Sequence, residues 1–140
     1  ETEAKMVHAA PNTSSKVVSK SISQQSGTTP YRCLVRVDED ATQAASVLSC
    51  EALLLDEQSV SLTPPDLKIA EEDARITHDT NVSKIDDVQL FYLMSRGLSA
   101  EQAMGLIVNG FFEPFTRELP MEYAVELNKL LELEMEGSIG

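Results

Sequence analysis

Hydrophobic and polar residues alternate along much of the first half of the chain. From Tyr31 to Val37 every second side chain is apolar, and Arg32 and Arg36 lie between them. Residues 16–21 alternate in the same way. Because successive side chains of a strand point to opposite faces, this pattern predicts strands with one buried face and one face in water.

The segments with this pattern are short and are separated by residues that favour turns. Pro11-Asn12, Gly27 and the acidic run 38–40 interrupt the chain, and Pro64-Pro65 interrupts it again later. We therefore predict a series of strands within the first 82 residues. They are residues 6–10, 16–23, 31–37, 44–50, 53–55, 66–69 and 75–79.

Two architectures fit short strands at irregular spacing. They could form a β-sandwich or the stacked coils of a parallel β-helix, and composition does not choose between the two. The many small Ser, Thr and Ala residues suit a β-helix, in which side chains of neighbouring coils stack in rows. The open end of such a stack needs a cap over its unpaired edge groups.

Residues 83–117 carry two signals for the start of a helix. Asp86 is followed by Gln89 three positions later, and Ser99 by Gln102, which is the spacing of a capping box. Gly97 lies where the first helix would need a left-handed residue to end. The sequence therefore predicts two helices joined by a short turn, each with an apolar stripe.

A third helix is predicted over residues 120–136. Pro120 suits its first turn and Gly137 suits its end. Its glutamates make one side acidic, which is most simply a solvated face. We therefore expect a β-rich part over residues 1–82 and a part with three helices over residues 83–140, with the helices as the cap of the strands.

The charge and the cysteine count argue against some classes of function. The chain has 11 basic and 23 acidic residues, a formal net charge of −12. Such a surface repels phosphate backbones and anionic lipids, which argues against nucleic-acid or membrane binding. No apolar run reaches the length of about 20 residues that a transmembrane helix needs. We expect no signal peptide, no disulfide framework and a reducing compartment, and the opening at Glu1 reads like the middle of a longer protein.

Few residues offer chemistry. Cys33 and Cys50 each lie in a predicted strand, where a free cysteine is most often a small buried hydrophobe. His78 and Asp79 are consecutive in a strand and should point to opposite faces. A thiolate, an imidazole and a carboxylate could bind iron or zinc, but no Cys-x-x-Cys or His-x-x-x-His spacing supports this. Neither a glycine-rich phosphate loop nor a nucleophile elbow is present.

A set of short motifs along the chain adds information. They are HAAPNTSS at 8–15, VSK at 18–20, YR at 31–32, LVRV at 34–37, SCEALL at 49–54, HD at 78–79, SKI at 83–85, QLFY at 89–92, RG at 96–97, IVNGF at 107–111, ELPME at 118–122 and EGSIG at 136–140. They resemble the C-terminal part of the SufB/SufD family of iron–sulfur cluster assembly scaffolds, and the resemblance covers almost the whole chain. The last motif favours the SufB branch of the family.

The resemblance implies the end coils of a right-handed parallel β-helix, capped by a C-terminal helical subdomain. It implies a scaffold without enzyme activity of its own, on which an iron–sulfur cluster is held transiently. Cys50 matches the family's cysteine that receives sulfur or ligates the cluster. His78 and Asp79 match residues proposed to ligate the cluster or to support activity, and we expect Cys50 and Asp79 as iron ligands.

The resemblance also implies partners. The helical subdomain would hold a SufC-like ATPase, and Phe91, Tyr92, Arg96, Phe111 and Phe112 are the candidate docking residues, although aromatic residues are often simply core. The β-helix end would pair with a SufD-like paralogue or with a second copy of the chain, and a sulfur donor protein would deliver sulfur. We expect a cytoplasmic location, or the plastid stroma in a eukaryote.

The sequence departs from the family pattern at three positions. Cys33 stands where the family usually has glycine, so no role is carried over to it. Asp79 replaces a glutamate and is one methylene shorter, and Thr77 cannot be a strong ligand. The N-terminal half of the family's chain has no counterpart here, so the first coil could dimerise or swap strands.

Two other functional classes are considered. The chain could be a SufD-like interaction module that binds the ATPase and holds no cluster. It could also be a β-helix hydrolase or lyase acting on polysaccharide. The second is disfavoured, because the acidic residues concentrate in turns and helices rather than along a strand-lined groove.

Overall fold

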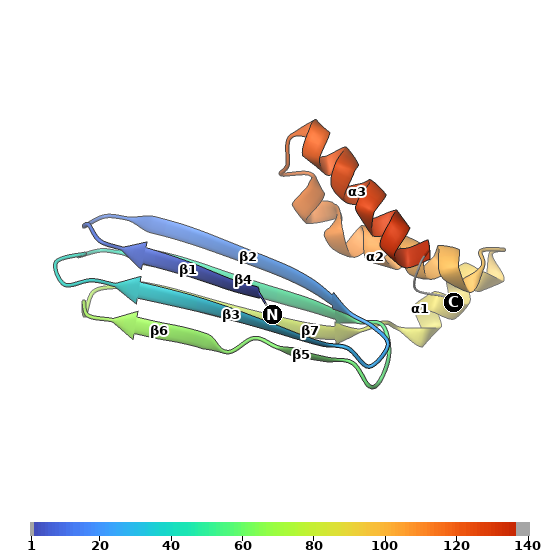
Figure 1. Cartoon of the computed structure of the whole chain (residues 1–140), viewed down its shortest axis with the longest axis horizontal. Helices are drawn as coiled ribbons and strands as arrows, with labels where there is room; N and C mark the ends of the chain where they lie inside the picture. Colours follow the sequence, from blue (N-terminus) through green and yellow to red (C-terminus); the bar gives the residue numbers. More distant parts are fainter. Residues whose placement is uncertain (1, 137–140) are drawn as a thin grey trace. The chain divides into compact units, whose positions relative to one another are not determined.

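The computed structural model describes residues 2–136 and divides the chain into two compact units, with the boundary between Lys84 and Ile85. The described part of the first unit consists of strands, and that of the second consists of helices (Figure 1). The predicted order, parallel strands followed by helices, is confirmed. Each unit is described by itself below.

The strands of the first unit form two sheets in which every pairing is parallel. One sheet has β3 between β1 and the pieces β5 and β6, and the other has the order β2-β4-β7. Strands β1 to β4 alternate between the sheets, β5 and β6 both pair with β3, and β7 returns to the second sheet. The arrows of the two sheets point in opposite directions (Figure 1). The bounds are β1 Thr2–His8, β2 Ser14–Ser23, β3 Thr28–Val37, β4 Ala45–Leu54, β5 Val60–Leu62, β6 Pro65–Ile69 and β7 Arg75–Lys84.

Several details of the strand prediction are wrong. β1 spans Thr2–His8 instead of residues 6–10, and β7 continues to Lys84 instead of ending at residue 79. Two further differences concern β4 and β5. In place of the predicted strands 44–50 and 53–55 there is one strand, β4 (Ala45–Leu54), in which Leu53 is buried on the outer face while Ala52 and Leu54 are buried on the inner one. The predicted break at Glu51 therefore does not exist. The three-residue strand β5 was not predicted, because it is defined only by its pairing with Thr28–Pro30 of β3.

The core of the first unit lies between the two sheets. Val35 of β3 and Leu48 of β4 are fully buried, and they belong to one cluster that also contains Val17 of β2. Arg32 and Arg36 are exposed on the other side of β3. The alternation seen in residues 31–37 is thus confirmed, and it brings the inner faces of the two sheets into contact.

Acidic side chains in one turn accept hydrogen bonds from backbone amides of an earlier turn, about 30 residues before them in the sequence. The amide of Gln43 donates to Asp73 at 3.0 Å, and the amide of Asp40 donates to Glu71 at 3.1 Å. Both donor residues lie in turns between strands and have positive φ, so their amides are outside the strand ladders. This arrangement gives the acidic turns a structural role, since they connect neighbouring turns.

The second unit contains α1 (Asp87–Ser95), α2 (Ala100–Thr116) and α3 (Met121–Glu136). The capping box of Ser99 and Gln102 is confirmed in both directions, and Gly97 ends α1 with φ of 98°. Asp86 accepts a hydrogen bond from the amide of Val88 at 2.9 Å. The predicted third helix is confirmed, whereas Gly137, its predicted end, lies outside the described residues. α2 is longer than its apolar stripe and continues through Pro114.

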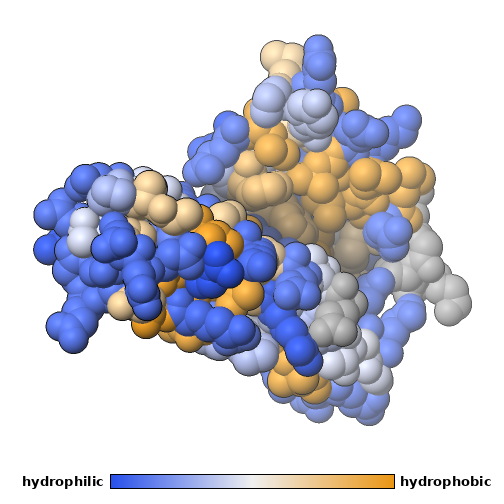
Figure 2. Space-filling model, turned by 60° about the vertical axis from the view of Figure 1, so that its left-hand side comes forward, coloured by the Kyte–Doolittle hydropathy of each residue, from blue (hydrophilic) through white to orange (hydrophobic). Residues whose placement is uncertain are grey.

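Little of the described helical unit is buried. Ala103 and Val108 of α2 are its only buried hydrophobic residues within the described part of the chain. Orange areas in Figure 2 show that apolar side chains reach the surface of the molecule. The exposed large hydrophobic residues of this unit are Val88, Phe91, Tyr92, Met94, Leu106, Met121, Tyr123, Val125, Leu130 and Leu133. Within residues 2–136, no helix is both long enough and apolar enough to span a membrane.

The Ser99 cap gives a first testable prediction. Replacing Ser99 by alanine removes the acceptor for the Gln102 amide, which lies 3.2 Å away, so the helical unit should lose about 1 kcal/mol of unfolding free energy. Ser99→Gly is the matched control and should cost only a few tenths of a kcal/mol, because water can reach the amides. Urea unfolding followed by circular dichroism measures both, and equal losses would contradict the capping role.

Candidate functional site

One contact and the strand register show which residues of the two sheets lie opposite one another in the interior of the first unit. Residues that lie opposite one another are called a level below. His8 Nε2 lies 2.9 Å from Ser15 Oγ, which places the end of β1 opposite the start of β2. In the next pair of strands, Val37 pairs with His8 and Ser46 pairs with Ser15. The end of β3 at Val37 is therefore level with the start of β4 at Ser46.

This register brings the two cysteines to the same level on opposite sheets. β3 and β4 run in opposite directions (Figure 1). Cys33 lies four residues before Val37, and Cys50 lies four residues after Ser46, so both cysteines are the same distance along the strands from this level. Both side chains belong to the inner faces, with exposed fractions of 2% for Cys33 and 3% for Cys50. Both thiols are free. The interior thus contains two facing thiols.

The strand next to Cys50 is the last one of its sheet. On β7, Thr80 pairs with Cys50 and His78 pairs with Leu48, so His78 and Thr80 share the inner face with the thiol. His78 Nε2 lies 3.1 Å from Thr80 Oγ1. Cys50 is therefore one strand away from the open edge of its sheet, with a hydroxyl and an imidazole between it and that edge.

Burial holds both thiols in the protonated form. It raises the pKa of Cys50, and the nearby Cys33 sulfur raises it further. Burial also raises the pKa of Cys33, while a hydrogen bond from the Tyr31 hydroxyl acts in the opposite direction. Burial and then the two thiols raise the pKa of Tyr31 to about 12. A thiolate at Cys50 therefore requires a bound metal ion or an opened site.

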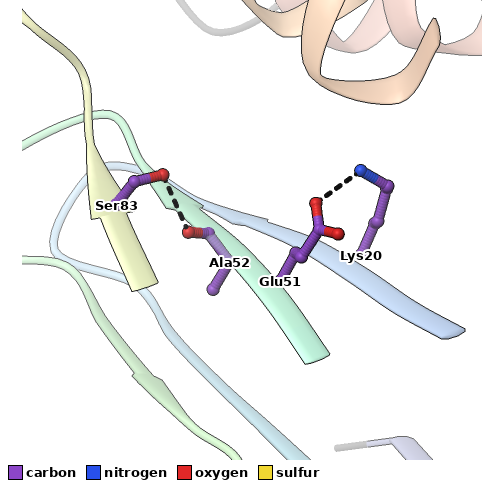
Figure 3. Close-up of polar contacts among 4 residues, drawn as sticks. All are labelled: Lys20, Glu51, Ala52 and Ser83. Atoms are coloured by element: carbon purple, nitrogen blue, oxygen red, sulfur yellow. Dashed lines mark hydrogen bonds and ion pairs between the residues drawn. The ribbon is translucent and has the colours of Figure 1, made fainter. Parts of the chain in front are cut away.

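Asp79 lies on the opposite face of β7 from His78, as the alternation predicts, and it is exposed. The same outer face of the sheet carries an ion pair between Lys20 Nζ and Glu51 Oε2, which are 2.6 Å apart (Figure 3). Cys50 points to the inner face. One chain in this conformation therefore brings Cys50 and His78 to the same face but separates both from Asp79.

Cys50 and His78 do not complete a metal site by themselves. Within the part of the chain that the structure describes, no three side chains of His, Cys, Asp or Glu gather closely enough to hold a metal ion. A thiol and an imidazole are suitable donors for iron, but two donors leave most coordination positions open. Any iron bound here needs further ligands besides these two donors.

Sequence reasoning missed two residues of this interior level, Cys33 and Tyr31. The alternation placed both on one face of β3, which is confirmed, but it could not show that this face meets Cys50. The missing information was the length of the turn between β3 and β4. A pattern in which two cysteines stand at equal distances from one turn is the signal that could have revealed their proximity.

The candidate docking residues on the helical unit fall into two groups. On α1, Phe91 and Tyr92 are exposed by 73% and 53%, and the Arg96 guanidinium lies 4.9 Å from the centre of the Tyr92 ring. On α2, Phe111 and Phe112 are half-buried, and their rings meet edge to face with centroids 5.2 Å apart. The first group is free to contact another molecule, whereas the second also contributes to packing.

The burial of the thiols gives a second testable prediction. In the native protein, the two cysteines should react with Ellman's reagent roughly tenfold or more slowly than an exposed cysteine, because they are shielded and protonated at neutral pH. In denaturing urea both should react at once. Fast reaction of both thiols without denaturant would contradict the interior position of this level.

Comparison with known proteins adds the family. Residues 1–111 match the family model described as the SufBD core domain of the SUF system for FeS cluster assembly. The chain is 54% identical over 137 residues to the iron–sulfur cluster assembly protein SufB of Bacillus subtilis, covering 98% of this chain and 30% of that protein. It is 53% identical over 140 residues to an iron–sulfur cluster assembly SufBD family protein of Mycobacterium bovis, covering all of this chain and 16% of that protein. The chain thus spans less than a third of these relatives.

Proposed function

Since this chain belongs to the SufB/SufD family of iron–sulfur cluster assembly proteins, we propose that it is part of a scaffold on which an iron–sulfur cluster is assembled as cargo. In this proposal Cys50 accepts sulfur or binds iron. The observation that supports it is the position of Cys50 on an inner face, one strand from the open edge of its sheet and on the same face as His78.

We propose that the strands are the end coils of a right-handed parallel β-helix. Three features support this architecture: every pairing is parallel, the chain passes from one sheet to the other and back with β5 and β6 as two pieces on the same side, and both sheets contribute to one core. Connections between parallel strands of one sheet are almost always right-handed, which supports the hand. In this architecture β6 and β7 form the last coil, and their outer edges can pair with another chain.

The remaining iron ligands would come from a second subunit at this edge, either a SufD-like paralogue or another copy of the chain. Cys50 and His78 would contribute from the inner face. Asp79, on the outer face, could ligate iron only in a site that forms around the edge of β7 together with the partner. Because Cys50 is only 3% exposed, the edge must open before sulfur or iron can enter. ATP hydrolysis by a partner ATPase is the proposed source of that movement.

The helical unit is the proposed docking site of this SufC-like ATPase. Its few buried residues and many exposed apolar side chains support a surface that is completed by a partner. Phe91, Tyr92 and Arg96 offer an exposed aromatic pair with a cation held above one ring, a composition common at the centre of interfaces. The free thiols fit a reducing compartment such as the cytoplasm.

A substitution at Phe91 tests the docking surface. Phe91→Ala should weaken binding of the ATPase by more than about tenfold, since truncating an interface aromatic often costs about 2 kcal/mol or more. It should not change the unfolding free energy, because Phe91 is exposed by 73%. Val47→Ala on β4 of the first unit, exposed by 44%, is the matched control and should leave the affinity unchanged. Calorimetric titration measures both, and equal affinities would exclude Phe91 from the interface.

A chemical analysis tests the scaffold against its alternative. The alternative is a SufD-like interaction module, favoured by the incomplete ligand set of the single chain. After anaerobic reconstitution with iron and sulfide, the protein with its partner subunits should retain iron and acid-labile sulfide through gel filtration. An interaction module would retain neither, and that result would overturn the scaffold function.

A further inference from the structure

Cys33 and Cys50 face each other, but the scaffold function proposed above gives a role to Cys50 only. The residues that pair with the two cysteines on neighbouring strands surround the pair. Ala4 and Pro65 pair with Cys33 in one sheet, and Thr80 pairs with Cys50 in the other. None of these neighbours is charged. The closest ionisable groups are the two thiols and the Tyr31 hydroxyl, which interact with one another.

The distance between the sheets decides which chemistry the pair can perform. Packed sheets lie about 10 Å apart, whereas a disulfide usually needs Cα atoms about 4.4–6.8 Å apart. A direct disulfide would therefore require the sheets to approach each other. A persulfide on one cysteine extends its reach by one S–S bond of about 2 Å, so its outer sulfur can approach the opposite thiol while the sheets stay in place.

We propose that Cys33 is a second sulfur carrier, which takes the outer sulfur from a persulfide on Cys50. This inference rests on the proposed role of Cys50 as sulfur acceptor. The Cys33 sulfur, as thiolate, attacks the outer sulfur of the Cys50 persulfide. A new S–S bond forms on Cys33, the S–S bond on Cys50 breaks, and Cys50 leaves as a thiolate that takes up the proton released by Cys33. One sulfane sulfur moves between two thiols, so no oxidant or reductant is consumed.

Tyr31 is a positioning residue in this transfer. Its hydroxyl donates a hydrogen bond to the Cys33 sulfur, which favours the thiolate that must attack. Tyr31→Phe removes this donor while keeping the ring, so it should slow the transfer to Cys33 without changing the loading of Cys50.

The transfer would let one chain hold two sulfur atoms. Once Cys33 carries the first sulfur, Cys50 is a thiol again and can accept another. The smallest common cluster, [2Fe–2S], contains two bridging sulfides. The two facing carriers therefore match the sulfur content of one such cluster.

The test follows sulfane sulfur on each cysteine. The purified complex of the protein with its partner subunits and ATP, in which the edge can open, is incubated without oxygen with glutathione persulfide. It is then alkylated, digested and examined by mass spectrometry. In the wild type, both cysteines should carry sulfur, with Cys50 loaded first. Cys33→Ala should retain about half of the total cyanide-labile sulfur, all of it on Cys50. Cys50→Ala should carry none on either residue.

The outcomes separate the two proposals. Sulfur on Cys50 that never reaches Cys33 would overturn the second carrier and leave the scaffold function in place. Absence of sulfur from both cysteines would instead overturn the role of Cys50 itself. Loading of Cys33 at the wild-type rate in Cys50→Ala would also overturn the inference, because it would show that Cys33 does not depend on Cys50. Thermal unfolding of each variant confirms that the interior is intact.

Discussion

Replacing Cys50 by serine should abolish the accumulation of an iron–sulfur cluster on the scaffold. The hydroxyl of serine neither forms a persulfide nor binds iron as a soft ligand, and no other cysteine can replace it from the same face of β4. Iron and acid-labile sulfide should fall to the background level after reconstitution, while the proposed binding of an ATPase to the helical unit should be unchanged.

Two controls accompany this substitution. Ser49→Ala changes the neighbouring residue on the outer face of β4 and should leave cluster formation at the wild-type level, since its side chain points away from Cys50. Cys50→Ala repeats the test without a buried hydroxyl, in case serine disturbs the interior. Normal amounts of cluster in both Cys50 variants would mean that this thiol is a packing residue only.

Replacing Leu48 by alanine should cost the first unit about 2–5 kcal/mol of unfolding free energy. Leu48 is fully buried between the two sheets, in the cluster that also contains Val35. Removing its side chain leaves a cavity that the paired strands cannot close. Val47→Ala, on the outer face of the same strand and exposed by 44%, is the matched control and should change stability by less than about 0.5 kcal/mol.

Urea unfolding measures both variants. The difference between them tests the orientation of β4 rather than strand propensity, because both positions lie in one strand and pair with β2 and β7 alike. If the two substitutions cost the same, the inner face of β4 is assigned wrongly. The inner position of Cys50, two residues after Leu48 on the same face, would then be wrong as well.

Local signals predicted much of the fold. The Ser99 cap, Gly97 at the end of α1 and the alternation in β3 depend on neighbouring residues only, and the structure confirms all three. β5 and the continuity of β4 could not be predicted in this way. They depend on pairing with distant strands and on burial of the outer face at Leu53.

The candidate site was predictable only in part. Alternation correctly separates Asp79 from His78, and strand pairing then brings His78 to the face of Cys50. The sequence could not show that Cys33 faces Cys50, because that depends on the turn between two strands of different sheets. The proposed ligands from a partner cannot be derived from one chain, since the two described donors do not fill a coordination sphere.

Iron K-edge X-ray absorption on the reconstituted complex tests the central claim most directly, because it reports which atoms surround the iron. The claim is that the thiol of Cys50 meets iron and sulfur at the open edge of a parallel stack. The account predicts a shell of sulfur neighbours in the wild type that is lost in Cys50→Ser. Iron surrounded only by oxygen and nitrogen, or an identical sulfur shell in the variant, would contradict it.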